Sequence, residues 1–242
     1  MISTPYHEGK LLLLNKPLGW TSFDVVNKVR YALEGHFKLK RMSIKVGHAG
    51  TLDPLATGLM LICTGKMTKQ VEAISGLPKV YTGTFVLGAT TASFDLEKPV
   101  DATFPTAHIT EEMVREVAKT FVGTHYQEPP VFSAKRVDGE RAYRAARRGE
   151  EVKMRKAEIE ITHFEVTRIA LPEVDFKVSC SKGTYIRSLA RDFGLALKSG
   201  GYLSKLERTE IGKYSLADAQ TVDDLVKDIR ATQLPVTAID LK

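Results

Sequence analysis

The stretch VGHAGTLDPLATGLMLICTGK, residues 46–66, contains a single acidic side chain, Asp53, among small, apolar and turn-forming residues. An Asp-Pro pair often begins a turn, because Asp bonds its own backbone and Pro fixes φ. Gly47 and Gly50 bracket His48, which predicts a loop whose backbone can approach a ligand closely. The following apolar run, LMLIC, predicts a strand. The lone carboxylate therefore has either a turn-forming or a chemical role.

The residues before this stretch predict a strand followed by a helix. GKLLLLNKP, residues 9–17, is typical of a buried strand that ends near Lys16 in a turn. Thr21 or Ser22 can then cap a helix. The apolar positions of that helix are Phe23, Val26 and Val29.

The residues after the stretch 46–66 alternate between strand and helix patterns. Residues 79–91 alternate like a strand, and residues 109–123 predict a helix capped by Thr110. A strand ending at Cys180 precedes a helix whose apolar positions are Ile186, Leu189 and Phe193. The pattern predicts an α+β fold in which a mixed or antiparallel β-sheet is flanked by helices and loops.

The composition predicts a globular protein with one dominant core and an anionic partner. The 242 residues are 43% hydrophobic and 26% charged, and Lys and Arg outnumber Asp and Glu by 35 to 29. Basic residues gather in residues 35–45 and 134–156, and the second stretch places Tyr143 among arginines. Such a mixture suits RNA phosphates and unpaired bases. It also suits a solvated helix face with i,i+4 ion pairs.

Several classes of cofactor and location are disfavoured. Cys63 and Cys180 lie in apolar stretches without paired spacing, which is typical of reduced cysteines in a cytoplasmic protein. The histidines lack metal-ligand spacing, and no G-x-G-x-x-G follows a strand. A phosphate loop is excluded because six residues separate Gly58 from Gly65 and Met67 replaces the Ser or Thr. No segment resembles a signal peptide or a membrane span. We therefore expect no cofactor, no metal and a cytoplasmic location.

Five segments of the chain are similar to the motifs of one known protein family. GHAGTLDPLATGLM, residues 47–60, is similar to the family signature G-H-x-G-x-L-D-P-x-A-x-G-x-L. The other similar segments are LLLNKPLGWTS (12–22), KVYTGTFVLGATTASFD (79–95), EPPVFSAKRVDGERAYRAARRG (128–149) and CSKGTYIRSLARDFG (180–194). They occur in the order found in the TruB family of tRNA pseudouridine-55 synthases, which the chain resembles over about residues 10–225.

The resemblance implies a fold and a reaction. The fold is the pseudouridine synthase catalytic fold, as a single domain over residues 1–242 with an RNA-gripping thumb at about residues 127–156. The reaction flips the T-loop uridine at tRNA position 55 and converts it to pseudouridine by breaking and re-forming the glycosidic bond. Asp53 is the catalytic carboxylate, acting as nucleophile or as base, and Arg187 pairs with it. Tyr81 stacks on the uracil and assists removal of the C5 proton.

The resemblance also implies substrate contacts. His48 fills the gap in the disrupted T-loop, while Tyr185 and Leu206 line the uracil pocket. The remaining candidates for phosphate or pocket contacts are Lys16, Lys135, Arg136 and Arg208.

The chain departs from the family pattern in two places. Many members carry a carboxy-terminal RNA-binding domain of the PUA type, for which little sequence remains before Lys242. We therefore expect recognition to rest on the catalytic domain and the tRNA T-arm. Lys98 replaces the Gly that usually ends the TxTxDxxG motif, and Ala92 and Phe94 also vary, whereas Asp95 is kept. We interpret this as a loop variation.

The resemblance favours a monomer that acts on tRNA and needs no DNA, membrane or protein partner. Two other hypotheses remain open. One is an RNA-binding or RNA-folding module with idle site residues, which the joint presence of Asp53, Tyr81 and Arg187 disfavours. The other is a synthase directed by guide RNA, as in related archaeal and eukaryotic enzymes, which the missing carboxy-terminal domain disfavours.

Overall fold

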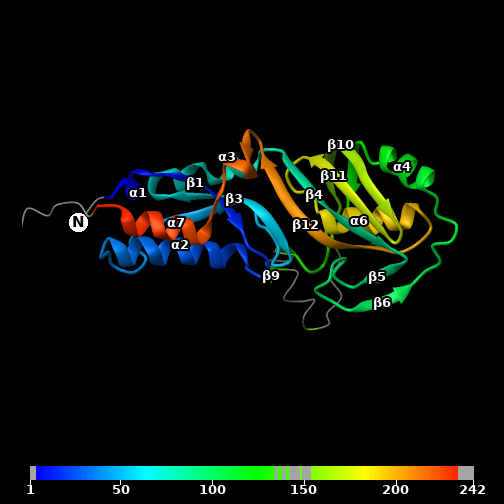
Figure 1. Ribbon diagram of the computed structural model, residues 1–242, viewed down its shortest axis with the longest axis horizontal. Coiled ribbons are helices and arrows are strands. Elements are labelled where there is room, and N and C mark those ends of the chain that lie inside the picture. The colour runs from blue at the N-terminus through cyan, green and yellow to red at the C-terminus, as the bar shows by residue number, and fades with distance from the viewer. Residues whose placement is uncertain (1–3, 134–135, 138–139, 142–147, 149–153, 234–242) are drawn as a thin grey trace, which may run out of the picture. The chain divides into compact units, whose positions relative to one another are not determined.

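A computed structural model describes residues 4–133, 136–137, 140–141, 148 and 154–233. The chain forms two compact units (Figure 1). Unit 1 comprises Met1–Leu77 with Glu207–Lys242, and unit 2 comprises Pro78–Leu206. Each unit contains strands and packed helices, which confirms the predicted α+β class. The single catalytic domain spanning residues 1–242 stays a prediction.

Unit 1 is built on mixed strand pairing. β1 (Leu11–Lys16) pairs antiparallel with β3 (Ala56–Thr64) and parallel with β14 (Gln220–Thr221). β2 (Val46–Ala49) pairs antiparallel with β3. The strands predicted from GKLLLLNKP and LMLIC are confirmed.

Two helices of unit 1 each follow a strand in the chain. α2 (Ser22–His36) and α7 (Val222–Ala231) pack against each other (Figure 1). Thr21 caps α2, since its hydroxyl accepts a hydrogen bond from the Asp24 amide at 3.1 Å. Of the three apolar positions predicted for α2, Val26 and Val29 are buried and Phe23 is exposed.

The remaining elements of unit 1 are short, and one of them contributes a side chain to a buried apolar cluster. They are α1 (Pro5–Glu8), η1 (Gly65–Gln70), α3 (Val71–Ser75), β13 (Tyr214–Ser215) and η2 (Leu216–Asp218). Ile74 of α3 belongs to a buried cluster with Leu59, Leu61 and Cys63 of β3. Cys63 is thus a free, buried thiol, as predicted.

Unit 2 contains an antiparallel sheet. Its strand order is β4 (Lys79–Leu87), β11 (Glu173–Cys180), β10 (Ala157–Ala170) and β7 (Gly123–Gln127). The predicted strands over residues 79–91 and up to Cys180 are confirmed, except that a short break separates β4 from β5 (Ala89–Thr91). Strand β12 (Gly201–Ile211) carries the chain from unit 2 into unit 1.

Helices and aromatic side chains form the core of unit 2. α4 (Glu111–Thr120) begins after Thr110, whose hydroxyl accepts from the Met113 amide, as predicted. α6 (Ile186–Ala196) places Phe193 beside Phe85 and Phe164, with ring centroids 5.5 and 5.6 Å apart. Ile186, Leu189 and Phe193 are all buried, so the predicted apolar face of α6 is confirmed.

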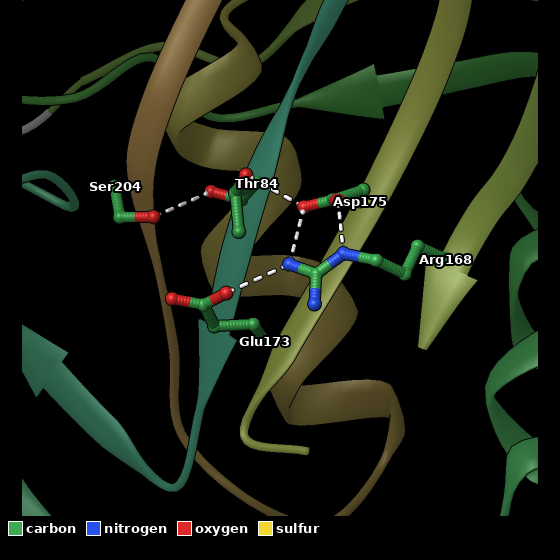
Figure 2. Close-up of polar contacts among 5 residues, drawn as sticks. All are labelled: Thr84, Arg168, Glu173, Asp175 and Ser204. Atoms are coloured by element: carbon green, nitrogen blue, oxygen red, sulfur yellow. Dashed lines mark hydrogen bonds and ion pairs between the residues drawn. The ribbon is translucent and has the colours of Figure 1, made fainter. Parts of the chain in front are cut away.

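The other face of this sheet carries a charged network (Figure 2). Arg168 of β10 donates to Asp175 at 2.5 Å and to Glu173 at 2.7 Å. Thr84 of β4 also donates to Asp175, and Ser204 of β12 donates to the Thr84 carbonyl (Figure 2). The hydrogen bond from Arg168 is the main cause that lowers the pKa of Asp175. Alternating side chains thus separate a charged face from the aromatic core.

Two further strand pairs lie in unit 2. β5 pairs with β6 (Val100–Thr103), and β8 (Arg136–Val137) pairs with β9 (Glu140–Arg141). Half of the predicted thumb, including Lys135, lies outside the described residues, and so does the side chain of Arg136.

Candidate active site

Asp53 lies in unit 1, in a loop between β2 and β3. The loop starts at Gly50, with φ 85°, rather than at Gly47, because residues 46–49 pair with β3. His48 therefore belongs to a strand, which corrects the predicted loop. The Ala56 amide donates to the Asp53 carbonyl at 3.1 Å, as in a turn. We call residues 50–55 the Asp53 loop.

Hydrogen bonds tie the Asp53 loop to the segment between β1 and α2. The Ser22 hydroxyl donates to the Leu52 carbonyl at 2.9 Å and accepts from the Leu52 amide at 2.8 Å. The Gly19 amide donates to the Pro54 carbonyl at 2.8 Å. The backbone on both sides of Asp53 is therefore fixed to the start of α2.

Lys16 supports the same loop from inside the protein. It is 0% exposed, and its Nζ donates to the carbonyls of Pro17, Trp20 and Pro54 at 3.0, 2.6 and 3.4 Å. Burial lowers its pKa to about 8, with the charge of Asp53 acting in the opposite direction. The predicted contact of Lys16 with phosphate stays a prediction, and in the structure the ammonium faces backbone carbonyls.

Arg208 is a second buried cation in unit 1. It is 1% exposed, and it donates from Nε to the Leu59 carbonyl at 2.8 Å and from Nη2 to the Gly50 carbonyl at 3.0 Å. Gly58, with φ 102°, lies so close that a Cβ there would overlap the Arg208 backbone. The guanidinium thus anchors the start of the Asp53 loop to β3.

His48 is held close to these groups. Its Nδ1 is buried and forms no hydrogen bond with the residues that the structure describes. Burial lowers its pKa, the positive charge of Arg208 lowers it further, and the Gly50 backbone opposes the shift. The imidazole is therefore neutral near pH 7.

Four predicted site residues lie around the Asp53 loop, because charges among them shift the pKa values of Lys16 and His48. They are Lys16, His48, Asp53 and Arg208. Unit 1 thus holds a carboxylate on a loop whose backbone is anchored at Gly50, Leu52 and Pro54. Such anchoring suits a group that must keep its position during a reaction.

Arg187 lies in unit 2, near the start of α6. Its side chain is 6% exposed, and Nη1 and Nη2 donate to the carbonyls of Ser93 and Phe132 at 3.2 and 3.0 Å. Nε lies 3.6 Å from the carboxylate of Asp95, which is also buried. The predicted pair of Arg187 with Asp53 joins residues of different units and stays a prediction.

Sequence reasoning did not assign Asp95 to the site. The available signal was that Asp95 is kept at the end of the motif over residues 79–95, which contains Tyr81. Asp95 lies between β5 and β6, where its carbonyl accepts from Thr91 at 2.6 Å and its carboxylate from the Glu97 amide at 2.9 Å. Phe94, with φ 62°, takes the left-handed conformation of this loop, whereas Lys98 does not. Lys98 therefore needs no glycine at its position, which supports the predicted loop variation.

The remaining predicted residues of unit 2 lie on separate elements. Tyr81 is buried on β4, opposite Val178 of β11. Tyr185 precedes α6, and its backbone amide and carbonyl both bond the side chain of Gln127, at 2.8 and 3.1 Å. Leu206 is half-buried on β12. Their contacts with substrate stay predictions.

Two structural findings concern metals and membranes. In the part of the chain that the structure describes, no three His, Cys, Asp or Glu side chains gather as a metal site would require. None of the helices described has the length and apolar character that a membrane crossing needs.

The chain matches a family model and similar proteins over most of its length. The model described as TruB family pseudouridylate synthase, N-terminal domain, matches residues 36–186. A curated protein of Flavobacterium johnsoniae named tRNA pseudouridine synthase B is 54% identical over 219 residues, covering 90% of this chain and 95% of that protein. One of the same name from Parabacteroides distasonis is 54% identical over 222 residues, covering 90% and 94%.

Solved structures are similar at lower identity. A chain in a Cbf5-Nop10-Gar1 complex gives a TM-score of 0.68 at 29% identity, with 92% of this chain and 54% of that chain covered. A chain in an H/ACA ribonucleoprotein bound to a substrate RNA containing 2′-deoxyuridine gives 0.66 at 27% identity, with the same coverage. This chain therefore spans about half the length of those solved chains.

Proposed function

This chain belongs to the TruB family of pseudouridylate synthases, and we propose on that basis that it isomerises a uridine of tRNA to pseudouridine. The observation that carries the proposal is the 54% identity, over 90% of the chain, with curated tRNA pseudouridine synthases. Those relatives are matched over 95% and 94% of their own length, so the likeness extends over nearly the whole of those relatives.

The reaction requires a carboxylate at the sugar. The N1–C1′ bond breaks, the uracil turns, C5 bonds to C1′, and the C5 proton is lost while N1 gains one. Asp53 supplies this carboxylate, either by attack on C1′ or by removal of a sugar proton. The hydrogen bonds at Gly50, Leu52 and Pro54 support this role, because they hold the loop in place while charge develops.

Tyr81 and Arg187 complete the chemistry that the family resemblance implies. Tyr81 stacks on the uracil and assists loss of the C5 proton, and Arg187 keeps Asp53 ionised. The burial of Arg187 supports the second role, since a guanidinium shielded from water acts more strongly on a nearby carboxylate.

The substrate is the T-loop uridine at position 55, which is flipped out of the tRNA loop. His48 fills the space it leaves, and a neutral imidazole suits stacking there better than a charged one, because it is less hydrated. Tyr185 and Leu206 line the uracil pocket, and the thumb, with Lys135 and Arg136, contacts phosphates.

The enzyme acts as a monomer in the cytoplasm without a protein partner or guide RNA. One solved chain in a Cbf5-Nop10-Gar1 complex and one in an H/ACA ribonucleoprotein favour a second candidate, a guide-directed synthase, but at 29% identity or less. The tRNA-specific relatives at 54% identity support the independent enzyme more strongly.

The test is to incubate the purified protein with an unmodified tRNA transcript and no guide RNA. Pseudouridine is then mapped by carbodiimide-dependent primer-extension stops. A stop at the T-loop uridine with wild type, absent with Asp53→Asn, is the expected result. Tight tRNA binding without any stop would favour the idle RNA-binding module, and a stop only after adding guide RNA and partners would favour the guide-directed enzyme.

A further inference from the structure

Three large apolar side chains are exposed around the Asp53 loop in unit 1. Leu18 is 63% exposed, Phe23 is 60% exposed and Leu55 is 37% exposed. A single exposed apolar residue is ordinary on a protein surface, whereas several at one place mark an interaction surface. We call these three residues the apolar rim.

Hydrogen bonds hold together the backbone segments that carry the apolar rim, on either side of Asp53. Leu18 precedes Gly19, whose amide donates to the carbonyl of Pro54, the residue before Leu55. Phe23 follows Ser22, whose hydroxyl bonds both backbone groups of Leu52. Each member of the rim is therefore next in sequence to a residue whose hydrogen bond links the Asp53 loop to the segment between β1 and α2.

The rim is built on rigid backbone. Thr21 caps α2 and its hydroxyl also donates to the Asp24 carboxylate at 2.6 Å, which fixes the first turn that carries Phe23. Lys16 bonds the carbonyls of Pro17 and Trp20, on either side of Leu18. The segment that carries Leu18 and Phe23 thus has an ordered backbone, so binding there costs little further ordering.

We propose that the apolar rim binds the nucleobases next to the target uridine, with Phe23 stacking on one of them. This rests on the proposed function. The nucleotides on either side of the uridine are covalently attached to it, so they lie over the residues surrounding Asp53 when the uridine reaches that carboxylate. Flipping the uridine removes it from the stack and exposes the flat faces of its neighbours to water. Aromatic and aliphatic side chains cover such faces favourably.

The same helix provides a matched control. Tyr31 of α2 is 55% exposed, comparable to Phe23, and lies eight residues further along the helix. It is thus an exposed aromatic residue remote from the Asp53 loop. Neither side chain is buried, so replacement of either leaves the core of unit 1 intact.

The experiment compares Phe23→Ala, Phe23→Trp and Tyr31→Ala in steady-state kinetics with unmodified tRNA. We expect Phe23→Ala to raise KM about tenfold with kcat within twofold, because one stacking contact is lost. Phe23→Trp should retain the wild-type KM, and Tyr31→Ala should match wild type. Melting temperatures should agree among all four proteins.

A second readout follows stacking directly. A T-arm stem-loop carries 2-aminopurine on either side of the target uridine, and Phe23→Ala should lose the fluorescence quenching that wild type and Tyr31→Ala show on binding. Equal KM values and equal quenching for Phe23→Ala and Tyr31→Ala would overturn the proposal. Wild-type dimers that Phe23→Ala dissociates in sedimentation would overturn it too, because the rim would then contact a second copy. The wild-type turnover tests the proposed function separately, since it does not depend on Phe23.

Discussion

The Ser22 hydroxyl forms two hydrogen bonds with Leu52, donating to its carbonyl at 2.9 Å and accepting from its amide at 2.8 Å. Both residues are buried. One side chain therefore satisfies both backbone groups of the residue before Asp53, and links the Asp53 loop to the first turn of α2.

Replacement of Ser22 by Ala should weaken this link. It leaves a buried amide and a buried carbonyl without partners, so the free energy of unfolding should fall by about 2 kcal/mol. Because the loop then loses one of its anchors, kcat should fall about tenfold while KM stays within twofold. Urea denaturation and steady-state kinetics with tRNA measure the two effects.

Ser215→Ala is the control for loss of a hydroxyl in unit 1. The Ser215 hydroxyl accepts from the Ala217 amide at the start of η2, at an exposed site. We expect a smaller loss of stability and an unchanged kcat. An unchanged kcat in Ser22→Ala as well would show that the position of Asp53 does not depend on the Ser22 hydroxyl.

A glycine comparison tests the close approach of β3 to Arg208. Gly58 and Gly19 both have positive φ, at 102° and 82°, but only at Gly58 would a Cβ overlap backbone atoms. Gly19→Ala should cost about 1 kcal/mol through backbone strain, and Gly58→Ala about 3 kcal/mol or more through strain and overlap. Chemical denaturation measures both. Equal losses would mean that β3 moves away from Arg208 without cost.

The elements that sequence predicted correctly are those fixed by neighbouring residues. The Thr110 cap, the strand that ends at Cys180 and the apolar face of α6 each follow from residues a few positions apart. The lone carboxylate at Asp53 was also visible in sequence, because its surroundings contain no other acidic group.

The partners of the site residues depend on tertiary structure, and sequence did not predict them. Arg208 bonds Leu59 and Gly50, which lie about 150 residues away along the chain, and Asp95 contacts Arg187. The glycines around His48 favoured a loop, but pairing with β3 made residues 46–49 a strand. Long-range pairing overrode the local preference there.

The ion pair of Asp95 with Arg187 leads to a further prediction. Their side chains are 7% and 6% exposed, so neutralising Asp95 removes a buried negative charge that lies beside the guanidinium of Arg187. Asp95→Asn keeps the size of the side chain, and it should lower the free energy of unfolding by about 3 kcal/mol. The Asp95→Asn variant should also lower kcat by a larger factor than it changes KM, because the guanidinium of Arg187 is no longer held in place. Denaturation and kinetics again measure the two effects.

Asp192→Asn, on the helix α6 that carries Arg187, is the matched control. Asp192 pairs with Arg191 at 2.8 Å, but their side chains are 31% and 21% exposed. Solvent screens that pair, so we expect a loss well below that of Asp95→Asn and normal kinetics. Similar losses in the two variants would contradict a special role for Asp95.

The buried amine of Lys16 predicts how stability changes with pH. Its pKa is lowered from 10.5 to about 8, chiefly by burial, so between these values the unfolded chain binds more protons than the folded one. The contribution of Lys16 to the free energy of unfolding therefore rises with pH, by about 2 kcal/mol between pH 7 and pH 9.5. Lys16→Met lacks this contribution, so its stability deficit relative to wild type should widen by that amount over the same range. Urea denaturation at constant ionic strength measures the deficit, with the exposed Lys69→Met as a control for surface charge. A deficit that stays constant or narrows as the pH rises would show that the Lys16 amine does not have the lowered pKa.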